Sequence, residues 1–367
     1  MADPTDADGQ ALRDWLASRG ATQEQIDWAT PGRIDRVRGG HGASFLAAQL
    51  VLTEGATLSA HDLADRSGLD LAAIIRGYRN LGVAVPDPHA AQFTEADLEF
   101  VSSYKHLAMP ELAADEDLDR VVAAAHERIA EAAVALYVQG PERDMVQRGV
   151  DPVTEAEKAE QATRMALDFA KAFAKAFGAL FRHHMRQAIA RQQVARAGVI
   201  RPELARLAIG FVDLAGSTAI EANLDPEKLA AMVSFFEARA FDVVADGGGR
   251  LVKFIGDEIM VAAPDPVAGC RIVQALVATF ADDGLRPRGG LVYGEVLFRH
   301  GDYYGPVVNL AARLVQEAIP GEVLVDGSIL DATATASDVE RPRFEPAGRR
   351  LLKGFDDPVR VWTLTAP

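Results

Sequence analysis

FVDLAGST, at residues 211–218, ends an apolar strand with the carboxylate of Asp213 and then turns through Gly216. KFIGDE, at residues 253–258, places Asp257 directly after another glycine in an equally apolar setting. A carboxylate at the edge of a buried strand costs free energy unless a cation compensates its charge. Two such carboxylates in neighbouring strands therefore predict a shared cation, and Mg²⁺ or Mn²⁺ bridging a triphosphate meets that need.

Outward from these stretches, short apolar strands alternate with amphipathic helices. We expect a βαββαβ order, with the second and third strands forming one hairpin, in the ranges Leu204–Leu214, Pro226–Val244, Arg250–Ala263, Pro266–Phe280 and Gly289–Phe298. A strand around Tyr303 should follow, and after it a helix at Val307–Ala318. Two further strands are expected at Glu322–Val325 and Val359–Thr363. This order predicts an α+β, ferredoxin-like domain with appended elements.

The turn after Asp213 can bind phosphate. Backbone N–H groups at Gly216, Ser217 and Thr218 can hold phosphate oxygens, while Asp213 and the backbone carbonyl of Leu214 face the metal ions. Taken singly, an aspartate beside a glycine turn is also typical of an ordinary turn. The metal interpretation therefore requires that Asp257 lie on a strand next to that of Asp213.

A third stretch, GDYYGPVVNLAAR at residues 301–313, places Asn309 and Arg313 four residues apart on one helix. Residues at this spacing share a helix face, so the two side chains can hold a ribose and a phosphate together. Lys253 lies four residues before Asp257, but the turn at Gly256 can separate their directions. Lys253 need not therefore serve the same site as Asp257.

Taken together, these stretches resemble the catalytic domain of class III nucleotidyl cyclases, in the same order and at similar spacing over about residues 203–367. The resemblance implies that Asp213 and Asp257 bind two divalent metal ions per site, Mg²⁺ or Mn²⁺. It implies that Lys253 and Asp302 select the purine, and that Asn309 and Arg313 stabilise the transition state. Ser217 departs from the family, where many members have phenylalanine, so no statement on selectivity rests on it.

The resemblance also implies the substrate and the assembly. A carboxylate and an ammonium match the N6 amino group and N1 of adenine, whereas guanine presents the reverse pattern, so Lys253 and Asp302 favour ATP over GTP. The segment LKGFDDPV at residues 352–359 matches the closing segment of the family, where a lysine, here Lys353, reaches the terminal phosphates. The two residue sets come from different subunits in the family, which implies a head-to-tail homodimer with two composite sites that form cyclic AMP and pyrophosphate.

Residues 1–199 are predicted to be an all-helical domain, and residues 200–367 the catalytic domain. The stretch TLSAHDLADRSGLDLAAIIR at residues 57–76 resembles a helix-turn-helix. DNA binding by such a pair requires cations around the second helix, and the surrounding chain is acidic. By its layout this half resembles the regulatory domain of soluble cyclases of the actinobacterial, mycobacterial type, which suggests autoregulation with pH or a fatty acid as the signal.

A long helix is predicted from about residue 152 to 197. It carries an apolar stripe with one residue every four positions: Met165, Phe169, Phe173, Phe177 and Phe181. The stripe indicates either a core or helix–helix seam, or a pocket for a lipid or acyl chain. His183 and His184 follow it, and because histidine changes charge between pH 5 and 8, the pair is a candidate for coupling protonation to domain geometry.

Composition limits the other possibilities. The net charge of -15 over 367 residues makes nucleic acid an unfavourable partner. The single cysteine, Cys270, excludes a disulfide within the chain. The acidic N-terminus and the lack of a long apolar run predict a cytoplasmic protein with no transmembrane segment. The alternative function is a cyclase-like nucleotide-binding protein whose helix-turn-helix half binds DNA.

Overall fold

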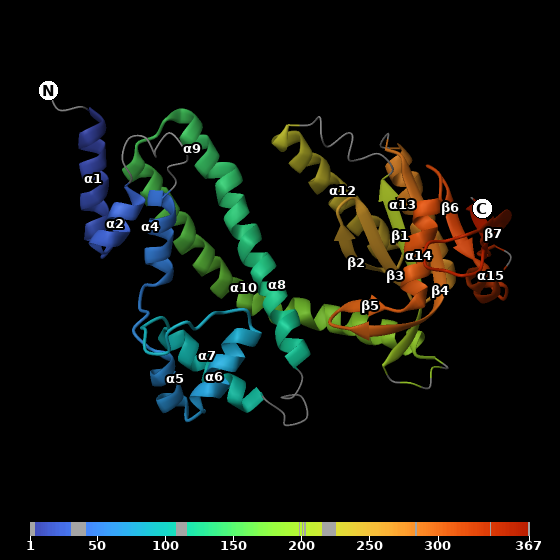
Figure 1. Ribbon diagram of the computed structural model, residues 1–367, viewed down its shortest axis with the longest axis horizontal. Coiled ribbons are helices and arrows are strands. Elements are labelled where there is room, and N and C mark those ends of the chain that lie inside the picture. The colour runs from blue at the N-terminus through green and yellow to red at the C-terminus, as the bar shows by residue number, and fades with distance from the viewer. Residues whose placement is uncertain are drawn as a thin grey trace. The chain divides into compact units, whose positions relative to one another are not determined.

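The computed structural model describes residues 4–30, 42–107, 116–197, 199, 201, 203–214, 225–282, 285–337 and 339–365 (Figure 1). The chain divides into two compact units, Met1–Leu180 and Phe181–Pro367. This division falls inside one long helix, α10, and the domain boundary at residues 199 and 200 stays a prediction. Each unit has its own hydrophobic core, so the two are described separately.

The described part of the first unit is helical, as predicted. Its helices are α1 (Pro4–Ser18), α2 (Gln23–Ala29), α4 (Gly42–Leu52), α5 (Ala60–Ser67), α6 (Leu71–Asn80), α7 (Glu95–Leu107), α8 (Glu116–Tyr137), a π-helical turn (Val138–Glu142), α9 (Arg143–Arg148) and α10 (Pro152–Ala195). Helix α10 matches the predicted long helix to within two residues at its end.

Local sequence explains the helix pair α5–α6. Ser59 and Asp62 form a capping box at the start of α5, Gly68 ends that helix with φ 71°, and the side chain of Asp70 caps α6. The pair packs with α7 around a small core of its own that contains Leu63, Ile74, Tyr78, Phe93 and Val101. The predicted helix–turn–helix arrangement is therefore present.

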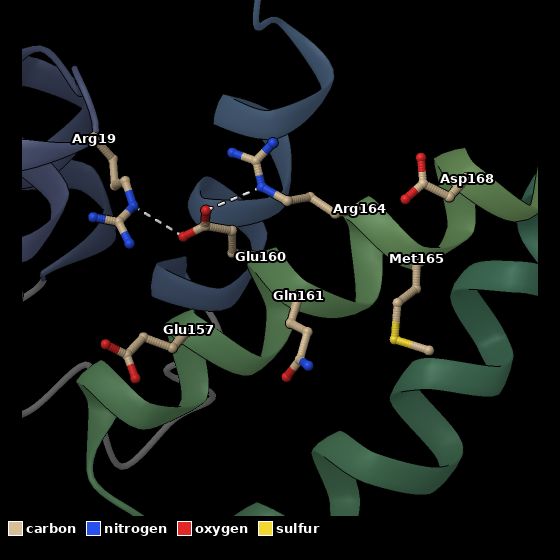
Figure 2. A pocket seen from close by; sticks show the side chains of 7 residues that line it. All are labelled: Arg19, Glu157, Glu160, Gln161, Arg164, Met165 and Asp168. Carbon is tan, nitrogen blue, oxygen red and sulfur yellow. Dashed lines mark hydrogen bonds and ion pairs between the residues drawn. The ribbon is translucent and has the colours of Figure 1, made fainter.

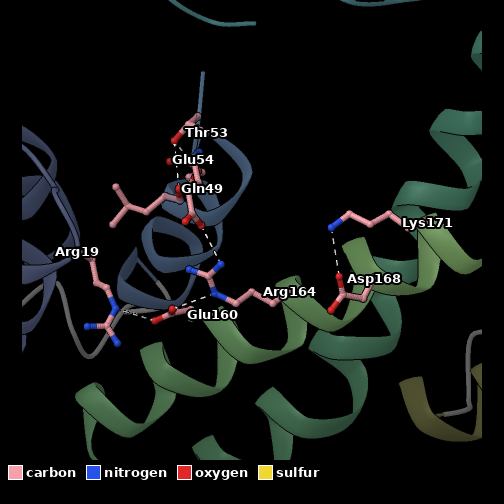
Figure 3. Close-up of polar contacts among 9 residues, drawn as sticks. Arg19, Gln49, Thr53, Glu54, Glu160, Arg164, Asp168 and Lys171 are labelled. Atoms are coloured by element: carbon pink, nitrogen blue, oxygen red, sulfur yellow. Dashed lines mark hydrogen bonds and ion pairs between the residues drawn. The ribbon is translucent and has the colours of Figure 1, made fainter. Parts of the chain in front are cut away.

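The beginning of α10 is attached to α1 and α4. Ala156 and Ala159 enter a core formed mainly by α1, α2 and α4. Beside this core, Glu160 accepts hydrogen bonds from Arg19 Nε at 3.0 Å and from Arg164 Nε at 3.1 Å, and Arg164 Nη1 also contacts Glu54 at 2.8 Å (Figure 3). Partial burial opposes ionisation of Glu160, but the bonds from the two arginines outweigh it and lower its pKa.

Among the residues that the structure describes, the aromatic stripe of α10 is not part of a buried hydrophobic core. Phe169 and Phe177 are 67% and 51% exposed, and the rings of Phe169 and Phe173 stack on each other with centroids 5.7 Å apart. This exposure does not fit a buried core, while a helix–helix seam and a pocket for a lipid or acyl chain stay predictions. Among the residues that the structure describes, no helix is both long enough and apolar enough to cross a membrane.

The second unit is an α+β domain, which confirms the predicted fold class. Its elements after α10 are β1 (Leu204–Leu214), α12 (Pro226–Asp246), β2 (Arg250–Ile255), β3 (Glu258–Ala263), α13 (Pro266–Asp282), β4 (Pro287–Arg299), β5 (Asp302–Tyr304), α14 (Pro306–Glu317), β6 (Val323–Asp326), α15 (Gly327–Thr333), β7 (Arg343–Arg350) and β8 (Val359–Thr365). The strand order is β2-β3-β1-β4-β6-β8-β7, with β5 paired to β4 (Figure 1). Strands β4 and β6 run parallel.

The two faces of this sheet carry different helices. Val212 and Leu214 of β1 belong to a core with α12 and α13, whereas Ile209 and Phe211 belong to a core with α14 and the end of α10. Helix α14 lies close to β4 at Gly290, where an added Cβ would meet the backbone of Ala311 and Val315 at 2.6 and 2.5 Å. Because side chains alternate along a strand, Asp213 lies on the same face as Phe211 and α14.

Candidate active site

Three charged side chains form a row across neighbouring strands. Glu258 of β3 and Arg288 of β4 are both register partners of Asp213 on β1. Arg288 Nε donates a hydrogen bond of 2.7 Å to Asp213 Oδ2, and Arg288 Nη2 lies 2.6 Å from the same oxygen. The carboxylate of Asp213 is thus held by a guanidinium from the adjacent strand.

Arg288 was not anticipated from the sequence. Its Nη1 also donates to the backbone carbonyls of Gln316 at 2.9 Å and Ala318 at 3.3 Å, at the end of α14. The only sequence signal is an arginine near the start of an otherwise apolar strand. One guanidinium therefore links Asp213 to the helix that carries Asn309 and Arg313.

Asp257 lies in the turn between β2 and β3, where Gly256 has φ 63°. Because β3 pairs with β1, this turn lies beside the end of β1 that carries Asp213, as the metal interpretation requires. Burial, and then the charges of Asp213 and Asp257, raise the pKa of Glu258 to about 7. The end of β1 and the turn thus concentrate negative charge on three carboxyl groups.

This donor set fits divalent metal ions. Mg²⁺ takes oxygen ligands and is commonly bound by one or two carboxylates together with substrate phosphates. A cation would relieve the crowding of Asp213, Asp257 and Glu258, and these side chains offer only oxygen atoms as ligands. Within the described residues, no group of three or more His, Cys, Asp or Glu side chains forms a ready-made metal cage. Phosphate oxygens would therefore have to complete the coordination.

The two residues predicted to select the purine meet directly. Lys253 Nζ donates a hydrogen bond to Asp302 Oδ2, and Asp302 Oδ1 accepts one from the backbone N–H of Tyr303 at 2.8 Å. The side chains of Lys253 and Asp302 are 39% and 20% exposed. The pair lies at an accessible surface, where a ligand can compete for both charges.

Asn309 and Arg313 lie on one face of α14, as their spacing predicted. Asn309 is exposed, and Arg313 is half-buried with its Nη1 3.0 Å from Gln316 Oε1. Lys353 is exposed in the loop between β7 and β8, next to Leu352, which is buried in the core beneath α14. Leu214 ends β1, while Gly216, Ser217 and Thr218 lie outside the described residues.

The regulatory candidates lie on α10. His183 and His184 are exposed, and His183 lines a hollow of about 570 Å³ together with Arg186, Gln187, Ile189, Ala190 and Gln193. A second hollow of about 360 Å³ lies beside the contacts of Glu160 in the first unit (Figure 2). Its lining is mostly charged: Arg19, Glu157, Glu160, Gln161, Arg164, Met165 and Asp168. Such a polar lining does not favour an acyl chain there.

Comparisons with known proteins identify the family of the chain. The family described as adenylate cyclase regulatory domain matches residues 4–192. An uncharacterised protein of Mycobacterium tuberculosis strain H37Rv is 33% identical over 311 residues, covering 82% of this chain and 77% of the relative. A pH-sensitive adenylate cyclase of M. tuberculosis strain CDC 1551 is 27% identical over 360 residues, covering 97% and 87%.

Among solved structures, the adenylyl cyclase CyaB from P. aeruginosa aligns with 45% of this chain and 95% of its own, at 22% identity and a TM-score of 0.39. The matched residues 4–192 include the helical unit, and the α+β unit follows it along the chain. The chain belongs to the adenylate cyclase family whose members carry the adenylate cyclase regulatory domain.

Proposed function

We propose that the protein converts ATP into 3′,5′-cyclic AMP and pyrophosphate at two composite sites of a homodimer. The observation that supports the substrate most directly is the ion pair of Lys253 with Asp302. The carboxylate of Asp302 accepts from the adenine N6 amino group, and the ammonium of Lys253 donates to N1. Guanine offers the opposite pattern, so the same pair disfavours GTP.

In the proposed reaction, the ribose 3′-oxygen forms a bond to the α-phosphorus, and the bond from that phosphorus to the bridging oxygen of pyrophosphate breaks. The 3′-hydroxyl proton leaves to solvent or to a nearby carboxylate. Asp213, the Leu214 carbonyl and Asp257 would hold two divalent metal ions. When bound, such ions would lower the pKa of the 3′-hydroxyl and neutralise charge on the triphosphate.

The side chains of α14 act on the reacting groups. Arg313 offsets the charge that develops on the α-phosphoryl oxygens, and Asn309 orients the ribose. Lys353 and the backbone at Gly216, Ser217 and Thr218 bind the remaining phosphate oxygens. Arg288 keeps the Asp213 carboxylate in one orientation and adds a positive charge beside the triphosphate.

A second copy of the chain is proposed to complete each site. Asn309 and Lys353 are exposed in one chain, and Asp213 is held by Arg288 of its own chain. A purine and its triphosphate need to be enclosed, and a head-to-tail pair would place the metal-binding end of one chain against the Lys253 and α14 surface of the other. ATP as substrate agrees with the proposed cytoplasmic location.

We further propose that the N-terminal domain regulates the enzyme. The exposed positions of His183, His184, Phe169 and Phe177 on α10, and the half-buried position of Phe173, are compatible with pH or a fatty acid as the signal. The helix pair α5–α6 alone would favour the DNA-binding alternative. However, Arg66 on α5 is paired with Glu95, and Asp62, Asp65 and Asp70 lie on or next to the two helices. These negative charges disfavour binding of a polyanion such as DNA.

One assay tests the enzyme proposal. Purified protein with ATP and Mn²⁺ is measured for cyclic AMP across pH 5.5 to 8, beside the variant Asp257→Ala. Product from the unaltered protein and loss of at least about a hundredfold in the variant are expected. Absence of product at every pH would reject the activity, and an equally active variant would reject the metal site.

A truncated form that begins near residue 200 tests regulation. If its activity has the same pH profile as that of the full chain, the N-terminal domain does not regulate the enzyme in response to pH.

A further inference from the structure

The carboxylate of Asp302 lies at the tip of a tight hairpin. Strands β4 and β5 are joined by His300 and Gly301, whose φ values of 54° and 76° are typical of a type I′ turn, and Arg299 is the register partner of Asp302. Strand β5 contains only Asp302–Tyr304. So short a hairpin has few backbone hydrogen bonds of its own, so the orientation of Asp302 depends on other contacts.

Arg250 supplies these contacts from β2. Its Nη2 donates to the carbonyl of Gly301, and its Nη1 donates to the phenolic oxygen of Tyr303 at 3.2 Å. Gly301 and Tyr303 are the residues directly before and after Asp302. The guanidinium also stacks on the hairpin, with its Cζ 5.4 Å from the ring centre of Tyr303 and 5.8 Å from that of Phe298.

An irregularity in β2 makes this arrangement possible. Side chains three residues apart on a regular strand point to opposite faces of the sheet. The register of β2 against β3 shifts between Leu251 and Lys253, so that Arg250 pairs with Ala262 and Lys253 with Met260. The bulge at Val252 thus brings Arg250 and Lys253 to the same face, where both reach the hairpin.

The end of α10 packs against the same group. Ala195 belongs to the hydrophobic core that contains Tyr303. Burial, and then the nearby charge of Arg250, lower the pKa of Arg191, one turn earlier on α10. The last turns of α10 therefore lie close to Arg250, the residue that holds the hairpin.

We propose that Arg250 is a positioning residue for purine recognition, because it binds the Gly301 carbonyl before Asp302 and the Tyr303 side chain after it, and so orients the Asp302 carboxylate toward the adenine edge. This inference rests on the proposed function of Lys253 and Asp302. In this proposal Arg250 acts through the hairpin and not by direct contact with substrate or metal. The bulge at Val252 contributes to this positioning, since it places the side chains of Lys253 and Arg250 on the same face of the sheet.

The test uses the full-length protein with Arg250→Met, Arg250→Lys and a matched control, Arg360→Met. Arg360 also stacks on an aromatic ring, Trp362 at 5.1 Å, but it lies on β8. Arg250→Met should raise the KM for ATP about tenfold, the effect of about one charge-assisted hydrogen bond, and lower the ATP-over-GTP ratio of kcat/KM by a similar factor. The kcat for ATP should change less than about threefold, since the contact is remote from the reacting phosphorus.

Arg250→Lys should restore part of the KM, because an ammonium can bond the Gly301 carbonyl but cannot reproduce the planar fork. Hydrogen exchange of the amides at residues 299–304 provides a readout without catalysis, and should be faster by about tenfold in Arg250→Met than in Arg360→Met. The positioning role would be overturned if Arg250→Met matched the Arg360→Met control both in amide exchange at residues 299–304 and in the ATP-over-GTP ratio of kcat/KM. Failure of the unaltered protein to form cyclic AMP would instead reject the proposed function, and the exchange rates would still decide whether Arg250 holds the hairpin.

Discussion

Arg288 and Asp213 face each other across β4 and β1, with 2.6 Å between Arg288 Nη2 and Asp213 Oδ2. Their side chains are only 24% and 17% exposed, so solvent screens the pair weakly. The same guanidinium caps the end of α14 through two carbonyls. Within one chain, this arginine joins the predicted metal-binding aspartate to the helix predicted to act in the partner's site.

Removing this arginine should destabilise the domain. In Arg288→Ala, Asp213 would keep its charge beside Glu258 without a compensating partner, and we expect the free energy of unfolding to fall by about 2 to 4 kcal/mol. Urea denaturation of the metal-free protein at pH 7.5 measures the change. The double variant with Asp213→Asn should regain about 1 to 3 kcal/mol, the coupling between the two side chains. Strict additivity of the two changes would contradict the interaction.

The raised pKa of Glu258 predicts a pH-dependent stability of the metal-free protein. Its folded-state pKa of about 7 lies above its ordinary value of 4.5, so the folded protein retains a proton that the unfolded chain has released. Unfolding then releases a proton, and stability is full below about pH 4.5 and declines as the pH rises to 7. The loss should be on the order of 1 to 3 kcal/mol.

The variant Glu258→Gln cannot ionise and should show a flatter profile over the same interval. Urea denaturation at pH 5, 6, 7 and 8 with a chelator present measures both proteins. Identical slopes for the two proteins would remove Glu258 as the source. Saturating Mn²⁺ should reduce the decline in the unaltered protein, because a cation offsets the ionised carboxylate.

Much of the catalytic fold could be predicted because its signals are local. Strand and helix periods, the turn at Gly256 and the N-terminal proline of α14 all agree with the observed βαββαβ order. The bulge at Val252 could not be predicted, since one extra residue leaves the apolar pattern of β2 almost unchanged. Its effect on the direction of Lys253 follows only from the pairing with β3.

The candidate site was predictable to the extent that motifs carry it. Asp213 and Asp257 adjoin glycine turns, and Asn309 and Arg313 share a helix spacing, so sequence alone singles them out. Arg288 has no such signal, because its importance comes from the strand register that places it opposite Asp213. Buried partners of this kind depend on contacts 75 residues apart in the chain, which local patterns do not encode.

The composite site predicts complementation between two inactive variants. Asp257→Ala removes a metal ligand and Arg313→Ala removes a transition-state residue, so each homodimer should lose at least about a hundredfold in activity. Mixing equal amounts under conditions of subunit exchange should form mixed dimers that contain one intact site. Random exchange places half the chains in such dimers, so activity should recover to about a quarter of the unaltered level. A mixture that stays inactive after proven exchange would show that each site lies within one chain.

The contacts of Glu160 should hold the start of α10 to helices α1 and α4. Glu160 is only 16% exposed and accepts hydrogen bonds from two arginines, so Glu160→Gln should lower the free energy of unfolding by about 1 to 2 kcal/mol and speed amide exchange at residues 152–164.

Lys171→Met is the matched control on the same helix (Figure 3). Lys171 pairs with Asp168 at 3.3 Å, but both side chains are more than three-quarters exposed, at 78% and 76%. Its loss should change stability by less than about 0.5 kcal/mol. Equal effects of the two substitutions would mean that the contacts of Glu160 are no stronger than a surface pair, and that the core around Ala156 and Ala159 alone attaches the helix.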